Sequence, residues 1–208
     1  MAVKTIVFDF GGVLIDWNPR YLYRKVFQSE TEMERFLTEV CAPEWNEQMD
    51  KGKPFKQGVA ELTALHPEYA EQIALFDTRW REMCAGEIAG SVDLLRRLAK
   101  KYPVYGLTNW SAEKFDVTYP EHDFFKLFKG IVVSGVEREI KPDPRLFEIL
   151  IERYGVDPAQ TVFTDDSPRN IETAEKLGFQ AIRFLSPEQL ETDLRAKGVM
   201  RDTIQLSD

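Results

Sequence analysis

A short apolar run near the start of the chain, Thr5 to Phe8, leads into the aspartate Asp9 and then into the glycine pair Gly11-Gly12. Buried parallel strands are rich in β-branched and aromatic residues, and open α/β sheets bind their ligands where such strands end. The glycines lack a Cβ atom, so an anion or a metal ion can approach the backbone closely. We therefore predict a strand at this run, with Asp9 at a binding edge of a parallel sheet.

The chain after this run changes to a helical pattern. From Asp16 to Gly86 the apolar residues recur at helical spacing, and we expect no strand there. From Ile88 onward strands alternate with helices, which is typical of a parallel sheet. The prediction is an α/β fold in which residues 1–15 and 87–208 form a Rossmann-like, doubly wound parallel sheet core. Residues 16–86 are expected to form an inserted all-helical cap, and residues 205–208 to be loosely held.

The composition limits the partners that we expect. With 27 lysines and arginines against 35 aspartates and glutamates, the formal net charge is -8. This charge argues against nucleic acid, because phosphate backbones attract basic surfaces. No apolar stretch is long enough to span a membrane and no signal-peptide pattern is present, so we expect a cytoplasmic protein that does not bind membranes. The amphipathic helices leave a homodimer open, because a dimer face and an internal core have the same pattern.

Polar side chains follow three of the predicted strands, at the point where each strand ends. They are Asp9, Thr108-Asn109 and Asp165-Asp166. Because the carboxyl ends of parallel strands meet at one edge of a sheet, we expect these side chains to lie close together. Carboxylates this close cannot all stay ionised without a cation. Carboxylate oxygens with no histidine or cysteine nearby in sequence are ligands that suit Mg²⁺.

Lys141 lies in a Lys-Pro-Asp-Pro turn, just beyond a further predicted strand at residues 131–133. The two prolines restrict the backbone and hold the lysine in a defined direction. At the same sheet edge its charge would offset the carboxylates and bind an anionic group.

In this order, these motifs resemble the four motifs of the haloacid dehalogenase-like hydrolase superfamily. The resemblance extends over nearly the whole chain and includes Asn170, four residues after Asp166. The helical insertion resembles the C1 cap of that family. The chain is most similar to the branch with the bacterial sugar-1-phosphate phosphatases, the N-terminal phosphatase domain of soluble epoxide hydrolases and the 2-haloacid dehalogenases.

The resemblance implies a magnesium-dependent phosphatase that acts on a small phosphorylated metabolite, such as a sugar phosphate. Asp9 would attack phosphorus and form an aspartyl-phosphate that water then hydrolyses. Mg²⁺ would be held by the Asp9 carboxylate, the Gly11 carbonyl and Asp166, with Asp165 behind them or as an alternative ligand.

The other motif residues would act on the phosphoryl group and its surroundings. By resemblance, Thr108 and the backbone of Asn109 would hydrogen-bond the phosphoryl oxygens, and Lys141 would stabilise their charge. Asn170 would orient the acidic loop or Lys141. The implied catalytic set is therefore Asp9, Thr108 and Lys141.

Gly11 departs from the family pattern. Most phosphatases of the family have a second aspartate at this position, which protonates the leaving oxygen and later activates water. Such acid–base catalysis typically contributes about 10² to 10⁴ in rate. The leaving group could need little protonation, as in an anomeric sugar phosphate or an acyl phosphate, or Asp16 at the neck of the cap could supply the proton.

Two alternatives to a phosphatase remain open. A 2-haloacid dehalogenase would use Asp9 to attack carbon and would need a cap arginine near the substrate carboxylate, for which the candidates are Arg20, Arg24 and Arg35. A domain that binds a phosphorylated metabolite or a protein partner with little turnover would also explain the missing acid.

We expect specificity to come from the cap, because a sugar ring or an apolar tail can stack on aromatic side chains. The aromatic residues nearest the site in sequence are Trp17, Tyr21, Trp45 and Trp110.

Overall fold

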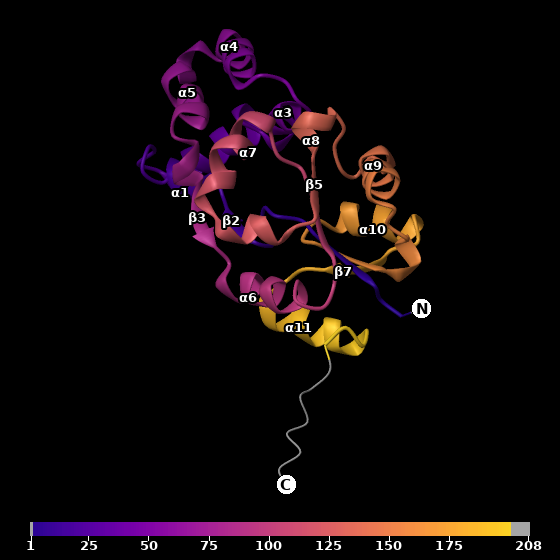
Figure 1. Ribbon diagram of the computed structural model, residues 1–208. Coiled ribbons are helices and arrows are strands. Elements are labelled where there is room, and N and C mark those ends of the chain that lie inside the picture. Colours follow the sequence, from indigo (N-terminus) through magenta and orange to yellow (C-terminus); the bar gives the residue numbers. More distant parts are fainter. Residues whose placement is uncertain (1, 201–208) are drawn as a thin grey trace.

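The computed structural model describes residues 2–200 and has a central sheet of five parallel strands (Figure 1). The strand order is β5, β4, β1, β6, β7, which places β1 in the middle. In chain order the strands are β1 Thr5–Phe8, β4 Val104–Thr108, β5 Gly130–Val133, β6 Thr161–Asp165 and β7 Gln180–Arg183. Each pairing in this sheet is parallel, so the predicted α/β fold is confirmed.

Helices cover both faces of the sheet. Successive residues of a strand point to opposite faces, so each strand packs against helices on both sides. Ile6 and Phe8 of β1 belong to one hydrophobic cluster, together with residues of α6 (Ala89–Leu98) and α11 (Pro187–Ala196). Val7 lies between them and belongs to a second cluster, with α9 (Pro144–Tyr154) and α10 (Pro168–Lys176). The strands are therefore buried on both sides, as expected for a doubly wound sheet.

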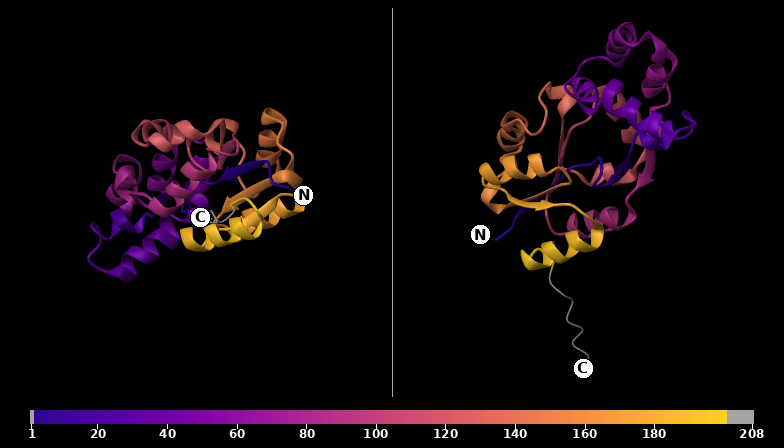
Figure 2. Two further views of the ribbon diagram at one scale, coloured as in Figure 1. Left: turned by 60° about the horizontal axis from the view of Figure 1, so that its bottom comes forward. Right: turned by 180° about the vertical axis from the view of Figure 1, so that it is seen from behind.

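The connection between β1 and α6 carries the helical insertion, which lies at the opposite end of the molecule from α11 (Figure 2). Its apolar side chains join the hydrophobic cluster of Ile6 and Phe8, so insertion and sheet share one core. Its helical elements are α1 Arg20–Tyr23, α2 Glu30–Arg35, a π-helical turn Phe36–Val40, α3 Pro43–Asp50, α4 Phe55–Leu65, a 3₁₀ turn Pro67–Tyr69, α5 Ala70–Thr78 and a 3₁₀ turn Trp80–Met83.

Two short strands frame the insertion, and they contradict the expectation that residues 16–86 contain no strand. They are β2 (Ile15–Trp17) and β3 (Cys84–Glu87), which pair antiparallel with Asp16 opposite Gly86. Strands of three and four residues are too short to show an alternating pattern. They form because the two ends of the insertion meet, and no pattern within one segment indicates that pairing.

The other described helical elements connect strands of the sheet. They are α7 Ala112–Thr118, α8 Ser134–Glu137 and the 3₁₀ turns Tyr119–Glu121, Asp123–Leu127 and Pro158–Gln160. Residues 205–208, which we expected to be loosely held, lie outside the described residues.

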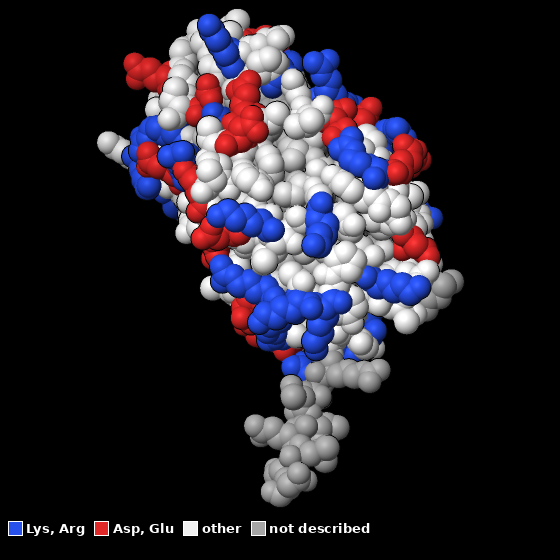
Figure 3. Space-filling view, viewed as in Figure 1, with Lys and Arg blue, Asp and Glu red and all other residues white. Residues whose placement is uncertain are grey.

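Charge is unevenly distributed over the surface. Lysines and arginines gather at the end of α6 and in the turn after it, at Arg96, Arg97, Lys100 and Lys101, far from the insertion (Figure 3). Within residues 2–200, no helix combines the length and the apolar character needed to cross a bilayer.

Candidate active site

Neighbouring strands of the sheet bring three carboxylates together at one edge. β1 pairs with β4 on one side and with β6 on the other, and all three run in the same direction. Asp9 directly follows β1, and β6 ends at Asp165. One carboxylate oxygen from each of Asp9, Asp165 and Asp166 lies within 4.8 Å of the other two. The structure therefore brings these residues together as the strand ends predict.

Lys141 places a buried positive charge between two of these carboxylates. Its Nζ lies 3.1 Å from Asp9 Oδ1 and 2.6 Å from Asp165 Oδ2. It also donates a hydrogen bond to the Leu107 carbonyl at 2.8 Å. Burial alone lowers the pKa of a lysine, but the two carboxylates more than offset this effect and the pKa of Lys141 is raised. Lys141 is therefore a fixed cation that faces Asp9.

The two aspartates of the acidic pair have different surroundings. Asp165 is fully buried, and its Oδ1 accepts hydrogen bonds from the Ser167 N–H and from Asn170 Nδ2, each at 2.9 Å. Its Oδ2 accepts from Lys141 Nζ. Asp166 is exposed and lines the open cavity at this edge of the sheet. Asp166 is therefore available to bind a cation, whereas Asp165 fixes the groups around it.

The glycine pair after Asp9 leaves space in two ways. Gly12 has φ +74°, and a Cβ atom there would lie 2.6 Å from Asp166 Oδ2. Only glycine thus allows the Asp166 carboxylate to lie over this turn. A Cβ atom at Gly11 would meet nothing within 4 Å. The position at which the family resemblance leads us to expect a second aspartate is therefore open space.

The electrostatics of Asp9 favour a bound cation. Burial raises the pKa of Asp9 to about 8. Lys141 opposes this shift, while the negative charges of Asp165 and Asp166 add to it. The Phe10 N–H donates to Asp9 Oδ1 at 2.7 Å and favours the ionised form. Of the three clustered carboxylates, those of Asp9 and Asp166 line the open cavity. They offer hard oxygen ligands, so the residues present fit a hard divalent ion such as Mg²⁺.

The two residues at the end of β4 differ in their hydrogen bonds. The Thr108 hydroxyl is buried and has no hydrogen-bond partner among residues 2–200. Thr108 is not among the residues that line the open cavity or a smaller cavity between the insertion and the sheet edge. The side chain of Asn109 makes two hydrogen bonds to the backbone of Lys141. Sequence reasoning missed this contact, because it joins residues 32 positions apart.

The open cavity in front of Asp9 contains most of the expected site residues. Its lining includes Asp9, Gly11, Asn109, Lys141, Asp166 and Asn170. The Asn170 side chain donates to both carboxylate oxygens of Asp165, at 2.9 and 3.0 Å, and so holds the acidic loop.

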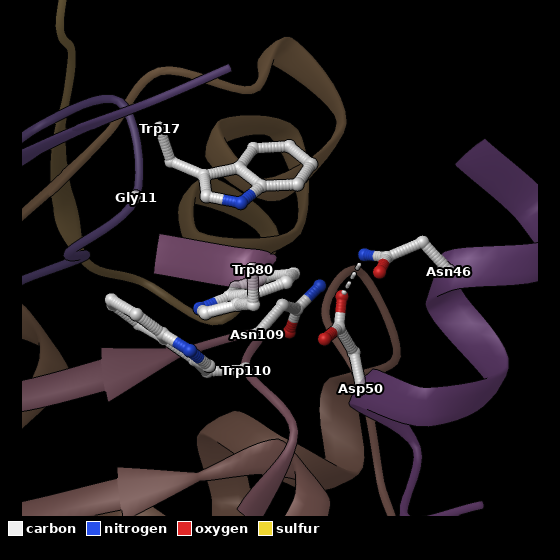
Figure 4. A pocket seen from close by; sticks show the side chains of 7 residues that line it. All are labelled: Gly11, Trp17, Asn46, Asp50, Trp80, Asn109 and Trp110. Atoms are coloured by element: carbon white, nitrogen blue, oxygen red, sulfur yellow. Dashed lines mark hydrogen bonds between the residues drawn. The ribbon is translucent and has the colours of Figure 1, made fainter. Parts of the chain in front are cut away.

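A smaller cavity, which we call the tryptophan pocket, lies between the insertion and the sheet edge (Figure 4). Its lining residues are Gly11, Trp17, Asn46, Asp50, Trp80, Asn109 and Trp110. Of the aromatic residues considered from the sequence, it contains Trp17 and Trp110. No local sequence pattern indicates Asn46, Asp50 or Trp80, because their positions depend on how the insertion packs.

The structure places three other candidates outside both cavities. The Asp16 carboxylate accepts hydrogen bonds from the Tyr21 hydroxyl at 3.0 and 2.9 Å, and neither residue lines a cavity at the site. Trp45 is buried, donates to the Gly58 carbonyl at 3.2 Å and packs edge-on against Phe76. Asp16 is therefore poorly placed to replace an acid at Gly11.

The three candidate arginines of the insertion all have carboxylate partners. Arg20 lines the open cavity, but its Nε and Nη2 bind the two oxygens of Glu34 at 2.5 and 2.6 Å. Arg24 pairs with Glu30 and Arg35 pairs with Glu39, all on the exposed surface. Each of the three guanidinium groups is therefore already paired with a glutamate rather than free to bind a substrate carboxylate.

The family model of the haloacid dehalogenase-like hydrolases matches residues 3–178, which include the whole site and the insertion. The chain belongs to this hydrolase family.

Known phosphatases resemble this haloacid dehalogenase-like hydrolase over most of its length. A sesquiterpene phosphatase from Aspergillus oryzae is 29% identical over 188 residues, which cover 87% of this chain and 89% of that protein. A D-ribitol-5-phosphate phosphatase from Bacteroides thetaiotaomicron is 24% identical over 198 residues, covering 87% and 91%. A haloacid dehalogenase-family enzyme from B. thetaiotaomicron, solved with magnesium and inorganic phosphate, has a similar fold. Its TM-score is 0.68 at 23% identity, with 89% of this chain and 96% of that chain covered.

Two phosphatases that resemble this haloacid dehalogenase-like hydrolase are thus named for very different organic groups, a terpenoid and a polyol phosphate. Family membership defines the hydrolase class. It leaves the organic part of the substrate to be inferred from the residues around the site.

Proposed function

We propose that this protein is a Mg²⁺-dependent phosphatase that hydrolyses a small phosphomonoester through an aspartyl-phosphate at Asp9. The observation that carries the proposal is the geometry around Asp9. A buried lysine ammonium lies 3.1 Å from its carboxylate, and two further carboxylates lie within 4.8 Å. This arrangement combines a nucleophile, a fixed cation and a metal site. The phosphatases among the relatives, and the magnesium and phosphate bound to a structural neighbour, support it.

In the proposed first step, a carboxylate oxygen of Asp9 attacks phosphorus. The bond from phosphorus to the ester oxygen breaks, and the leaving oxygen takes its electron pair and gains a proton from solvent water. In the second step water attacks the phosphorus of the aspartyl-phosphate, which releases inorganic phosphate and restores Asp9. Lys141 and the Phe10 N–H both contact Asp9 Oδ1, which orients the carboxylate for this attack.

The metal would be held by Asp9, Asp166 and the Gly11 carbonyl. When bound, it would neutralise charge so that the carboxylate and the phosphate dianion can approach each other. Asp165 would not bind it directly, because both of its oxygens already accept hydrogen bonds. Thr108 would donate its unpartnered hydroxyl to a phosphoryl oxygen, and Lys141 would stabilise the charge that develops there.

The absence of an acid at Gly11 should bias the enzyme toward certain leaving groups. Gly11 lines the open cavity at the position that normally protonates the leaving oxygen, and it has no side chain that could do so. We therefore propose faster turnover of esters whose leaving group needs little protonation. Residues 16–86 would act as a cap that supplies the walls around that group.

A dehalogenase remains the second candidate, because halide leaves without a proton and Gly11 offers none. Its weakness is the lack of an unpaired cap arginine, since Arg20 is bound by both oxygens of Glu34.

The test is phosphate release from p-nitrophenyl phosphate, acetyl phosphate and sugar 1-phosphates, with Mg²⁺ or with EDTA, by the wild type and by Asp9→Asn. Phosphate release that requires both Mg²⁺ and Asp9 is the expected result. Halide release from 2-chloropropionate without added metal would establish the dehalogenase instead. The absence of both activities would favour a domain that binds a phosphorylated metabolite or a partner with little turnover.

A further inference from the structure

Buried polar atoms without a hydrogen-bond partner are concentrated in the residues around the tryptophan pocket. Seven buried side-chain polar atoms of the described residues have no hydrogen-bond partner, and four of these seven belong to residues that line this pocket. They are the indole N–H groups of Trp17, Trp80 and Trp110 and the Oδ1 atom of Asn46. Buried polar groups are normally paired, so a cluster of unpaired ones in one cavity points to a ligand that pairs them.

The residues that carry these atoms are well fixed. Trp80 and Trp110 are only 5% and 4% exposed, and the ring centroids of Trp17 and Trp80 lie 5.6 Å apart. In the view of Figure 4, the three indoles lie on one side of the pocket and the Asn46–Asp50 pair lies on the other. The pocket therefore has aromatic walls that carry donors and an opposite wall that carries acceptors.

Asp50 makes that opposite wall able to accept or donate. Its carboxylate accepts a hydrogen bond from Asn46 Nδ2 at 2.9 Å and is buried at the end of α3. Burial raises the pKa of Asp50 to about 7, so both protonation states are accessible near neutral pH. A hydroxyl group can pair with either state.

The tryptophan pocket adjoins the cavity at the nucleophile. Gly11, Trp17 and Asn109 line both cavities. A Cβ atom at Gly11 would meet nothing within 4 Å, so there is open space at this shared residue. A phosphoryl group at Asp9 can thus extend its organic part past Gly11 into the pocket. The pocket has a cavity volume of about 70 Å³, which restricts it to a compact group.

We infer that the tryptophan pocket binds the organic part of the substrate, and that this part is a compact polyhydroxylated group such as a short polyol or a sugar. The inference rests on the proposed phosphatase function and names its substrate class. Hydroxyl oxygens accept from the indole N–H groups, hydroxyl protons pair with Asn46 and Asp50, and the C–H faces lie on the aromatic rings. A hydrocarbon of the same size leaves the buried donors unpaired, and sites built for hydroxyl groups reject such analogues.

The experiment compares kcat/KM for ribitol 5-phosphate with kcat/KM for n-pentyl phosphate. Both esters have a five-carbon primary alkoxide as leaving group, so the acid missing at Gly11 affects both. Comparing this ratio between the wild type and the pocket variants separates recognition of the hydroxyl groups from leaving-group ability. We expect a ratio of at least about 100 in the wild type. A ratio of one or less, or faster hydrolysis of farnesyl phosphate than of ribitol 5-phosphate, would overturn the inference.

Two variants and a matched control locate the effect. Trp110→Phe removes one donor and keeps an aromatic ring, and Asn46→Leu removes the acceptor, so each should lower the ratio about tenfold. Trp45→Phe is the same substitution in a buried tryptophan whose N–H already binds the Gly58 carbonyl, outside the pocket, and should keep the wild-type ratio. Equal ratios in Trp110→Phe, Asn46→Leu and the wild type would contradict the assignment.

A separate assay shows whether the proposed phosphatase function itself fails. If acetyl phosphate is hydrolysed no faster by the wild type than by Asp9→Asn, the protein is not a phosphatase. The pocket is then tested by binding, from the change in tryptophan fluorescence on titration of Asp9→Asn with each five-carbon phosphate. Tighter binding of ribitol 5-phosphate supports the inference, and equal or weaker binding overturns it.

Discussion

Asn109 and Lys141 are joined by two hydrogen bonds that lock one loop of the site to the end of β4. Asn109 Nδ2 donates to the Lys141 carbonyl at 2.9 Å, and the Lys141 N–H donates to Asn109 Oδ1 at 2.8 Å. The side chain of Lys141 can therefore reach Asp9 and Asp165 from a backbone that is held in place. Asn109 acts through Lys141 in addition to any contact of its own backbone with the phosphoryl group.

Replacing Asn109 with alanine should reduce both kcat and stability. The variant leaves the Lys141 N–H and carbonyl without partners, which should lower the free energy of unfolding by about 1 to 3 kcal/mol. A displaced Lys141 should lower kcat roughly 10- to 100-fold. The checks are urea unfolding and phosphate release at saturating Mg²⁺.

Thr173→Val is the matched control for this prediction, because it removes one hydrogen bond, from the Thr173 hydroxyl to the Pro142 carbonyl, in the same loop but away from Asp9. A similar loss of kcat in both variants would show that general loosening of the loop, rather than the Asn109–Lys141 pair, sets the rate.

Binding of Mg²⁺ should release a proton at neutral pH. Burial raises the pKa of Asp9 to about 8, so much of the carboxyl is protonated at pH 7 before the metal binds. A metal ligand must be ionised, so the apparent affinity should rise about tenfold per pH unit below pH 8. Calorimetry in two buffers of different ionisation enthalpy measures the released proton.

The control for this linkage is Asp9→Asn, which has no proton to release at this position and should bind Mg²⁺ weakly with little dependence on pH. Equal Mg²⁺ affinity of the wild type at pH 6 and pH 8 would show that Asp9 is already ionised in the metal-free protein.

Asp50 should make the protein less stable as the pH rises. Burial raises its pKa from 3.8 to about 7, so the folded state binds this proton more tightly than the unfolded state does. The resulting stabilisation is complete below pH 4 and is lost as the pH rises toward 7. Between pH 5 and pH 8 the loss should reach about 3 kcal/mol. Asp50→Asn cannot titrate, so its free energy of unfolding should lack this contribution.

The measurement is urea unfolding of the wild type and Asp50→Asn at pH 5 and at pH 8. The difference in stability between the two proteins should shift in favour of Asp50→Asn at the higher pH. A difference that is the same at both values would mean that Asp50 titrates normally in the folded protein.

Gly11→Asp should restore part of the missing acid–base catalysis. A Cβ atom fits at Gly11 without contact, and Gly11 is not among the glycines with positive φ, so the fold should tolerate a side chain. The gain should appear for poor leaving groups, where protonation matters most, and reach about 10². The measurement is the ratio of kcat/KM for ethyl phosphate to that for acetyl phosphate. Gly11→Asn, which has the same size but no acidic proton, should not raise this ratio.

The part of the site that could be predicted from the sequence follows from one rule of parallel sheets. Asp9, Asp165 and Asp166 stand at strand ends, and strand ends of a parallel sheet share an edge, so their convergence needed no knowledge of packing. Lys141 was placed in the same way, by its position beyond β5. The local sequence patterns that indicate these residues do not depend on how distant segments pack.

The remaining parts depend on contacts between distant segments. β2 and β3 pair only because the insertion returns to its starting point, and Trp80 and Asp50 reach the site only because the insertion packs on the sheet edge. From its position after β4, Asn109 is expected to contact the phosphoryl oxygens through its backbone, and the structure adds that its side chain holds Lys141. Hydrogen-bond partners of this kind are set by tertiary structure, which periodicity and spacing do not encode.

The most direct test of the central claim is to trap the phosphoryl group on Asp9. Hydrolysis of the aspartyl-phosphate should be slow, because no side chain at Gly11 activates the attacking water, so the intermediate should accumulate with a good leaving group such as acetyl phosphate. The wild type is mixed with Mg²⁺ and acetyl phosphate, quenched in acid within the first turnovers, and digested for mass spectrometry. The account predicts a phosphoryl group on the peptide that contains Asp9, and none on that peptide from Asp9→Asn. Rapid turnover with no phosphorylated peptide, or with the phosphoryl group on another residue, would contradict it.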